Sequence, residues 1–516
     1  MQFFDSTFWL FMVLIAGCST GIADDPDRDT RPNVIILYAD DMGYGDLACQ
    51  NLDSKIPTPH LDRLASEGLR FTDGHSSSGI CTPSRYALLT GRYHWRDFNN
   101  IVGPMGESVF DDGQFTLARM FKQVGYRTGC VGKWHLGWGW ESVRKKEWTQ
   151  KDSLVRENRR NYYFYPSEAY DWSLPIPDGP LDQGFDYYFG DGTINFPPYA
   201  WVENDRLLES PTWTMRHPQG MALEGNWEAR PGPAVEGWDF FEVLPRITKK
   251  AKEYIVGQQD QKEPFFLYVP FSAPHAPIIP NEEFRGLSQA GPYGDFVHQT
   301  DWCVGEILKA LEQIGESDNT IVIFTADNGP ERYAYERIRK YDHHSAHPFR
   351  GLKRDVYEGG HHVPFLVKWP GKIKPNALSN QLIHQVDLLK TLAAIVDVTL
   401  PAGLAHDSHD FSEVWLGETS NLPIRPLAVH NTFQDKYGLR QGDWIYINSR
   451  DGYHSKPPDW VEDHFSYEPS DAEVLLFNLK DDIGQGKNLA LEMPEKVQEM
   501  QALLTNIRSG ETFIEQ

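Results

Sequence analysis

The sequence is poor in basic residues, and this shortage excludes one large class of partners. Lysine and arginine number 49 against 73 aspartates and glutamates, so the formal net charge is −24 over 516 residues. Nucleic acid is therefore excluded as the main partner, because phosphate backbones are bound by basic surfaces. A small anionic substrate remains allowed, since a single site can be locally basic on an acidic protein.

Cysteine is also scarce, and its spacing excludes two further classes. The five cysteines stand at positions 18, 49, 81, 130 and 303, and no CxxC pair occurs. The spacing rules out a zinc ribbon or a thioredoxin-type motif, and the number is too low for a disulfide scaffold. One or two disulfide bridges are the most that the sequence allows.

Long apolar runs are missing except at the N-terminus. Phe8–Ala16 is apolar but short for a membrane span, and it is typical of a signal-peptide core. The residues that end at Cys18 resemble a bacterial lipobox, which predicts a lipoprotein signal over 1–17 and a lipid on Cys18. Plain secretion with a signal over 1–23 is the alternative, and so is a misassigned start or a buried N-terminal element, because Met1–Thr7 contains no Lys or Arg. We expect a periplasmic, outer-membrane-anchored or secreted protein that contacts a membrane only through that lipid.

Short strand patterns alternate with helical ones along the chain. Apolar runs at 33–38, 264–270 and 320–326 predict buried parallel strands, and amphipathic patterns at 59–69, 116–124 and 293–314 predict helices. This alternation predicts an α/β fold with a large, mainly parallel sheet covered by helices on both faces. In such folds the functional site lies beyond the carboxyl ends of the strands.

The expected domain organisation has two parts after the signal. A main domain covers 31–424, with long irregular insertions around 138–263 that are rich in tryptophan. The last segment, 425–516, predicts a small antiparallel sheet with one helix, from a hairpin pattern at 437–447, a strand at 473–479 and an amphipathic helix at 494–507.

Acidic and amide side chains follow two of the predicted strands. Asp40 and Asp41 come after the first strand, and Asp327 and Asn328 follow the strand at 320–326. If these strands are neighbours, four oxygen-bearing side chains converge, and hard oxygen ligands favour Ca²⁺ or Mg²⁺ over zinc. The alternative is that each pair only ends a strand and caps a helix.

The segment from Cys81 to Arg85 predicts an anion site. Pro83 can occupy the first turn of a helix, which places Cys81 at the helix start. A helix N-terminus attracts anions and lowers the pKa of a thiol, and the guanidinium of Arg85 adds a forked donor. The alternative is a buried structural cysteine beside a helix start.

Cys81-Thr82-Pro83-Ser84-Arg85, followed by Leu89-Thr90-Gly91-Arg92, resembles the signature of type I sulfatases, a formylglycine-dependent, arylsulfatase-like family of the alkaline phosphatase superfamily. Further segments match the family in order along the chain. They are Asp40-Asp41, Gly132–Gly137, Gly184–Asp186 with Phe189-Gly190, His275 between two Ala-Pro pairs, Asp327–Gly329, Lys353 with Tyr357–Gly360, and Phe477–Ala490.

The resemblance implies a fold, a cofactor and a modified residue. The family fold is an alkaline-phosphatase-like sandwich with a smaller C-terminal domain. A maturation enzyme oxidises the cysteine that matches Cys81 to formylglycine. The family metal is usually Ca²⁺, with Mg²⁺ as the alternative, and the implied ligands are Asp40, Asp41, Asp327 and Asn328 with the modified Cys81 beside them.

The resemblance also implies a mechanism. One hydroxyl of the hydrated aldehyde attacks sulfur and forms a covalent sulfate. The metal and the side chains of Arg85, Lys133, His275 and Lys353 neutralise the sulfate oxygens. His275 is the candidate acid for the leaving alcohol, with Lys353 as a helper, and His135 takes a proton from the second hydroxyl. Taken singly, Lys133, His135 and Lys353 read as surface polar groups, and His275 as a loop packing residue.

The implied activity is hydrolysis of sulfate esters. Aromatic insertions suggest sugar stacking, although large rings also fill irregular loops. We therefore expect a sulfated polysaccharide or oligosaccharide as substrate, with a broad-specificity arylsulfatase as the alternative. A phosphatase of the same superfold would need a Ser or Thr nucleophile, and a non-catalytic binder of sulfated glycans would result if Cys81 stays a thiol. Histidines at 94, 343, 344, 347, 361 and 362 could be substrate contacts or structural groups.

Overall fold

The computed structural model describes residues 29–155, 161–216, 222–224, 229–418, 422–433, 435–454 and 456–510. The predicted signal segment and Cys18 lie outside these described residues. Within the described part, no helix combines the length and apolar character that crossing a membrane requires.

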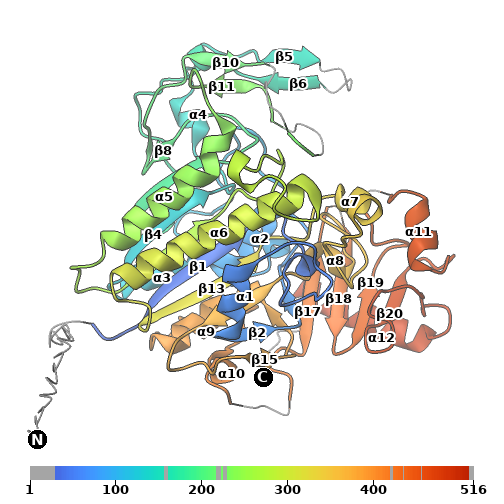
Figure 1. The fold of residues 1–516 in the computed structure, drawn as a ribbon. Coiled ribbons are helices and arrows are strands. Elements are labelled where there is room, and N and C mark those ends of the chain that lie inside the picture. Colours follow the sequence, from blue (N-terminus) through green and yellow to red (C-terminus); the bar gives the residue numbers. More distant parts are fainter. Residues whose placement is uncertain are drawn as a thin grey trace, which may run out of the picture.

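A ten-stranded sheet forms the middle layer of the molecule (Figure 1). From one edge to the other it consists of β15 (Ala377–Ser379), β2 (Leu69–Phe71), β14 (Phe365–Lys368), β13 (Thr320–Ala326), β1 (Asn33–Ala39), β12 (Phe265–Pro270), β4 (Arg127–Lys133), β7 (Tyr187–Gly192), β8 (Val202–Glu203) and β9 (Arg206–Leu207). The five strands from β13 to β7 are parallel, whereas β14 and β8 run antiparallel to their neighbours β13 and β7. The prediction of a large, mainly parallel sheet is confirmed.

Helices cover both faces of this sheet. One face carries α1 (Pro59–Ser66), α5 (Val243–Val256) and α6 (Gly291–Gln313), and the other carries α2 (Cys81–Thr90), α3 (Leu117–Gln123) and α9 (Leu388–Ile395). Side chains of β1 alternate between the two layers: Ile35 and Leu37 pack on the first, and Ile36 on the second. Since both faces are buried, β1 is apolar throughout, which explains its unbroken hydrophobic run.

A smaller sheet forms the C-terminal part (Figure 1, orange to red). Its antiparallel strands are β17 (Leu427–Asn431), β18 (Tyr437–Gln441), β19 (Trp444–Ile447) and β20 (Leu475–Asn478), and α12 (Pro494–Ser509) packs on one face. The predicted hairpin and helix are confirmed. The other face of the sheet packs on Tyr357, which belongs to the main domain.

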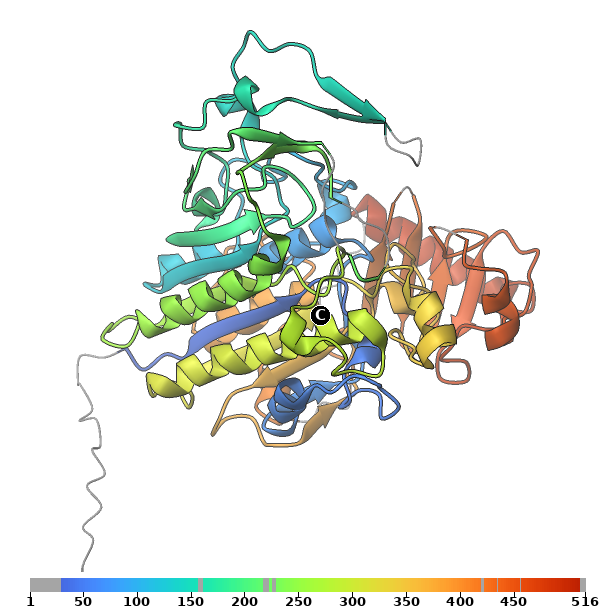
Figure 2. The same cartoon turned by 45° about the horizontal axis from the view of Figure 1, so that its top comes forward.

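Residues 138–263 contain both irregular and regular structure. Two short pairs, β5 (Asp152–Val155) with β6 (Asn161–Phe164) and β10 (Trp213–Met215) with β11 (Gly232–Ala234), lie at the top of the molecule in Figures 1 and 2. The same range also supplies β7 and α5 to the sandwich. The remaining helices are α4 (Trp140–Val143), α7 (Ala334–Tyr341), α8 (Glu358–His361), α10 (Ser412–Trp415) and α11 (Trp460–Phe465), and the remaining strands are β3 (Gly74–His75) and β16 (Ile383–His384).

One predicted helix is too long. The pattern at 59–69 includes Leu69 in the helix, but α1 ends at Ser66 and Leu69 begins β2. Gly68 forms the junction, where a Cβ would stand 2.2 Å from the carbonyl oxygen of Val367. Leu69 is buried at the start of β2, and it would also be buried at the end of an amphipathic helix. Its apolar character therefore could not distinguish the end of a helix from the start of a strand.

Shortening Leu37 tests how much the central strand contributes to stability. Leu37 is fully buried, so Leu37→Ala leaves a cavity and should lower the free energy of unfolding by about 2–5 kcal/mol. Leu52→Ala is the matched control, because Leu52 is 97% exposed and should change that free energy by no more than about 0.5 kcal/mol. Equal losses in denaturant unfolding would contradict this account of the core.

Candidate active site

The carboxyl ends of β1 and β13 bring together the two acidic segments. The strands are parallel neighbours with Ala39 opposite Ala326, so Asp40 and Asp41 lie beside Asp327 and Asn328. All four side chains are buried, and the backbone N–H of Asp41 donates to Oδ1 of Asp327 at 3.2 Å. The structure therefore shows the convergence that strand adjacency predicts.

Two lysines from different elements meet these carboxylates. Lys133, the last residue of β4, forms an ion pair with Oδ2 of Asp40, and Nζ of Lys353 lies 2.5 Å from Oδ1 of Asp41. A bulge at Gly132 precedes Lys133, with φ of 138° and the carbonyl oxygen of Pro270 only 2.0 Å from where a Cβ would stand. This close approach requires glycine and helps to direct Lys133 to the site.

Cys81 and Arg85 reach the same carboxylates from the start of α2. Cys81 is the first residue of α2, and Arg85 follows one turn later on the same side of the helix. Sγ of Cys81 lies 3.6 Å from Oδ1 of Asp40, and Nη2 of Arg85 lies 2.8 Å from Oδ2 of Asp327. The predicted cysteine and arginine are thus adjacent to the acidic centre.

Two predicted histidines lie on loops around this centre. Nε2 of His275 is 3.8 Å from Oδ2 of Asp41, and Nδ1 of His275 contacts the carbonyl oxygen of Ala276. His135 lies beyond the end of β4 at a φ of 50°, so it does not share a strand with Lys133. Nε2 of His135 contacts the carbonyl oxygen of Val102 at 3.0 Å.

The donor atoms at this centre fit a hard cation. One ligand atom from each of Asp40, Asp41, Cys81 and His275 lies within 4.8 Å of the others. Oδ2 of Asp41 and Oδ1 of Asn328 are buried and have no hydrogen-bond partner among the described residues. Buried oxygens without a donor are costly unless a cation or water satisfies them, and carboxylate and amide oxygens suit Ca²⁺ and Mg²⁺.

Charge at the centre is distributed unequally. Burial alone would raise the pKa of Asp40, but the positive charges of Lys133, His275 and Arg85 hold that pKa well below its usual range. Burial and the negative charge of Asp40 raise the pKa of Asp327 to about 7, against the opposing effect of Arg85. One of the two carboxylates therefore carries its charge readily, whereas the other needs an additional cation.

The prediction of a lowered thiol pKa at Cys81 is wrong. Burial, followed by the negative charge of Asp327, raises the pKa of the thiol, and the ammonium groups of Lys133 and Lys353 only partly offset this. The helix N-terminus does not compensate for a fully enclosed position between carboxylates. A thiol at this position is therefore a poor nucleophile at neutral pH.

Sequence reasoning missed one buried acid near the centre. Asp191 is the penultimate residue of β7, at the same edge of the sheet, and burial raises its pKa to about 7. Neither of its carboxylate oxygens has a hydrogen-bond partner among the described residues. It lines a pocket with His135, Trp138 and Phe196. A sequence signal was present, since Asp191 lies at the carboxyl end of its strand, close to the position of Asp40 and Asp327 directly after theirs.

The other histidines that the sequence left open are mostly internal. His343 contacts Oδ1 of Asp46 at 2.9 Å, and His94 contacts Oγ of Ser77 at 2.8 Å. His361 and His362 are buried, which removes them from a substrate surface. The tryptophans of the insertions also pack inward in part: Trp201 stacks on Phe189 with ring centroids 5.0 Å apart.

Comparisons with known proteins agree with this geometry. The family model described as Sulfatase matches residues 32–398. N-acetylgalactosamine-6-O-sulfatase of Bacteroides thetaiotaomicron is 32% identical over 96% of this chain and 97% of its own length. Human arylsulfatase A is 31% identical over 93% of this chain and 89% of its own length. A solved structure from work on glycosaminoglycan metabolism by Bacteroides thetaiotaomicron has a TM-score of 0.75 at 31% identity, covering 93% of this chain and all of that chain (100%).

The raised thiol pKa predicts that unmodified Cys81 is unreactive in the folded protein. Iodoacetamide at neutral pH should leave Cys81 unlabelled in the folded protein and label it after unfolding, because the thiolate is the reacting form. Mass spectrometry of the tryptic peptide from Phe71 to Arg85 measures this. Cys49, half-buried with a pKa raised by burial to about 12, provides an internal comparison and should also label slowly. Fast labelling of folded Cys81 would refute the assignment of a buried, neutral thiol.

Proposed function

The chain belongs to the sulfatase family, and we propose that it removes sulfate from a sulfated polysaccharide or oligosaccharide through a formylglycine made from Cys81. As a sulfatase it is a sulfuric ester hydrolase. The observation that carries the proposal is the placement of Cys81 beside Asp40, with Arg85, Lys133 and Lys353 on the surrounding carboxylates. Three cationic side chains, each held by a carboxylate, thus lie next to one candidate nucleophile.

The substrate class rests on the relatives. A bacterial relative that matches nearly the whole chain is named for 6-O-sulfated N-acetylgalactosamine, and a similar solved structure comes from glycosaminoglycan metabolism. We therefore take 6-O-sulfated N-acetylgalactosamine as the first substrate to test. The similarity to human arylsulfatase A keeps a broad-specificity arylsulfatase as the second candidate.

Conversion of Cys81 to formylglycine would remove the difficulty of a buried neutral thiol. The hydrated aldehyde supplies a hydroxyl nucleophile on a carbon that can later release sulfate by elimination. The position at the start of α2, beside Asp40, suits such a group, and a maturation enzyme is the implied partner. Processing at the N-terminus, with export and a lipid on Cys18, remains a prediction for residues outside the described part.

We assign the cation site to Asp40, Asp41, Asp327 and Asn328, with residue 81 beside it. Ca²⁺ is the proposed ion and Mg²⁺ the alternative, because the donors are carboxylate and amide oxygens. When bound, the ion supplies positive charge that stabilises the sulfate oxygens during transfer. The partnerless oxygens of Asp41 and Asn328 support this assignment.

Three cationic side chains complete the sulfate site. Arg85 is held by Asp327, Lys133 by Asp40 and Lys353 by Asp41. Each is fixed by a carboxylate partner and is nearly or fully buried, so its charge acts in a poorly solvated environment. They would bind the sulfate oxygens and neutralise the charge that develops on them.

Hydrogen bonds to backbone carbonyls give the two histidines different proton positions. Nε2 of His135 faces the carbonyl oxygen of Val102, so its proton lies there and Nδ1 keeps a lone pair. Nδ1 of His135 has no partner among the described residues, which suits a base that accepts a proton from the nucleophile. Nδ1 of His275 faces a carbonyl in the same way, so Nε2 of His275 can donate only when the ring is charged.

Loss of residue 81 provides the direct test of function. Protein produced in a host that exports it should release sulfate from 6-O-sulfated N-acetylgalactosamine. Cys81→Ala should lower kcat/KM by several orders of magnitude, because the nucleophile is lost. The matched control is Cys303→Ala, which removes another fully buried thiol that lies in α6. Sulfate release and peptide mass spectrometry for an aldehyde at position 81 are the measurements.

Each other result selects a different function. Turnover of aryl sulfates alone would favour the broad-specificity arylsulfatase. A thiol at position 81 without turnover would favour a binder of sulfated glycans, which direct binding of a sulfated oligosaccharide would measure. Full activity of Cys81→Ala with folding retained would overturn the proposed nucleophile.

The acid role of His275 predicts an acidic pH optimum. Burial, followed by the positive charge of Lys353, lowers the pKa of His275 from its ordinary value of 6.5. The charged form that donates from Nε2 is present below this pKa and is lost as pH rises, so kcat/KM should fall about tenfold per pH unit above it. His275→Gln should lower kcat by about 10²–10⁴-fold and remove this alkaline limb.

The shape of the pH profile separates this role from a structural one. A packing role for His275 would lower activity in the variant but leave the alkaline limb in place. Such a profile would contradict the assignment of His275 as the acid.

A further inference from the structure

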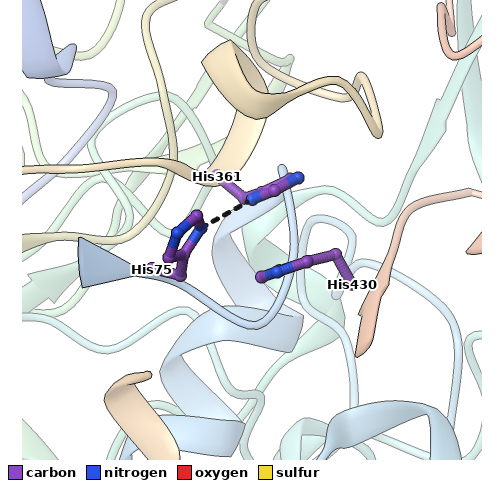
Figure 3. Close-up of side chains that lie close together, drawn as sticks. All are labelled: His75, His361 and His430. Atoms are coloured by element: carbon purple, nitrogen blue, oxygen red, sulfur yellow. Dashed lines mark hydrogen bonds between the residues drawn. The ribbon is translucent and has the colours of Figure 1, made fainter. Parts of the chain in front are cut away.

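A second group of side chains meets at the junction between the main domain and the C-terminal sheet (Figure 3). His75 of β3, His361 of α8 and His430 of β17, here called the histidine cluster, each place one ring nitrogen within 4.8 Å of the others. All three are buried, with at most 2% exposure. The cluster shares no residue with those assigned to sulfate and to the cation site.

Contacts on the outer side of the three rings fix where their protons lie. Nε2 of His75 contacts Oδ1 of Asp73 at 2.7 Å, Nε2 of His361 contacts the carbonyl oxygen of Val356 at 3.2 Å, and Nδ1 of His430 contacts the carbonyl oxygen of Ser76 at 3.2 Å. A carboxylate and two carbonyls can only accept, so each of these nitrogens carries a proton. A neutral imidazole has one N–H, and its other nitrogen is then a lone pair.

The inner nitrogens therefore face one another without protons. Nδ1 of His75 and Nδ1 of His361 are 3.1 Å apart, and Nε2 of His430 has no hydrogen-bond partner among the described residues. Two lone pairs at this separation repel each other. The repulsion is removed by a metal ion between them or by a proton on one of them, and that proton either makes a ring cationic or gives up an outer contact such as that of His361 with Val356.

An additional proton is the weaker of these two alternatives. Burial lowers the pKa of all three histidines, that of His361 to about 4 and those of His75 and His430 well below their usual range. Charged imidazolium at this position is therefore disfavoured at neutral pH. A metal ion satisfies the same lone pairs without a second proton on any ring.

We propose that the histidine cluster binds one divalent transition-metal ion, with Zn²⁺ as the reference ion. Imidazole nitrogens suit Zn²⁺, Cu²⁺ and Ni²⁺ rather than Ca²⁺. Two nitrogens 3.1 Å apart can both lie about 2.1 Å from one ion, which gives an angle of roughly 95° at the metal. Hydrogen bonds from the far N–H to a carboxylate or carbonyl are the usual way in which metal-binding histidines are oriented.

His430 has to turn when the ion binds. Its ring stacks on that of His361, with centroids 3.7 Å apart and planes 8° apart (Figure 3). A metal lies close to the plane of each imidazole that binds it, and two stacked parallel rings cannot share one ion in this way. The ion is bound first by His75 and His361, and His430 joins by rotation about its side-chain bonds.

A neighbouring ligand set is less suited to the ion. Asp73, Glu358 and His362 lie on the other side of His75 and also approach one another. The guanidinium of Arg440 already supplies positive charge there, since it is 3.1 Å from Oδ2 of Asp73 and 3.6 Å from Oε2 of Glu358. A divalent ion placed there would be repelled by that guanidinium. At the histidine cluster the charge of Arg440 affects the pKa of His75 and His361 less than the opposing charge of Glu358 does.

The bound ion would be structural. It would tie β17 of the C-terminal sheet to β3, which leads directly into the loop before Cys81. That loop already contacts α8 and β17. The N–H of Ser76 donates to the carbonyl oxygen of His361 at 2.9 Å, and Oγ of Ser78 donates to the carbonyl oxygen of Asn431 at 2.6 Å. The ion is therefore expected to raise thermal stability rather than to take part in sulfate transfer.

Metal titration of the whole chain tests the proposal. The protein is stripped with chelator, saturated with Ca²⁺ to fill the oxygen site, and then titrated with Zn²⁺ under equilibrium dialysis. We expect one Zn²⁺ per chain, a higher melting temperature with Zn²⁺, and a Co²⁺ derivative whose visible spectrum shows nitrogen ligation. Loss of partners that only orient a ligand weakens metal binding about 10–100-fold, so removal of a ligand should cost at least tenfold.

Two variants and one control keep the test specific. His430→Phe keeps a flat ring in the stack and removes the ligand, and His361→Gln removes a different one. His409→Phe is the control, because His409 is buried and also has a nitrogen without a partner, but it lies outside the cluster. Zn²⁺ binding should weaken in the first two variants and persist in the control.

The proposal is overturned if the folded, Ca²⁺-saturated chain binds no Zn²⁺, or if both ligand variants bind it as tightly as the unchanged chain. If both variants fail to fold, the Co²⁺ spectrum of the unchanged chain decides, and a spectrum without nitrogen ligation overturns the proposal. Sulfatase activity is not the readout, so these results stand apart from the proposed substrate and nucleophile.

Discussion

Burial of three carboxylates at one edge of the sheet is the constraint on which the rest of the site depends. Asp40, Asp41 and Asp327 are almost completely enclosed, and charges enclosed in this way are stable only when opposite charges compensate them. Lysines from two separate elements and an arginine from a third provide that compensation. Each of these segments carries charge that the others need. The strand ends, α2 and the loop that carries Lys353 therefore have to fold together.

The same electrostatics explain why residue 81 is unsuited to act as a thiol. Its neighbours are carboxylates, which oppose a thiolate, and they are also the groups proposed to bind a hard cation. A neutral hydroxyl nucleophile is compatible with this environment, whereas a thiolate is not. The proposed conversion of Cys81 to formylglycine would replace the thiol with such a hydroxyl.

The smaller sheet is connected to this centre through buried polar contacts. The loop of Ser76 to Ser78 bonds to α8 on one side and to β17 on the other, and it continues into α2. Its position depends on the C-terminal sheet although that sheet supplies none of the assigned sulfate ligands. A metal ion in the histidine cluster would strengthen this connection. It would stabilise the domain junction close to residue 81.

Features that follow from local patterns could be predicted from the sequence. Unbroken apolar runs located the central strands, and polar residues at their ends located Asp40, Asp41, Asp327 and Asn328. Features that depend on contacts with distant residues could not be obtained in this way. They are the end of α1 before Leu69, the raised thiol pKa of Cys81, and the Asp191 carboxylate without a hydrogen-bond partner among the described residues. Tertiary structure decided these because burial and the charge of distant residues set the pKa of a group, and because chain segments far apart in sequence supply both.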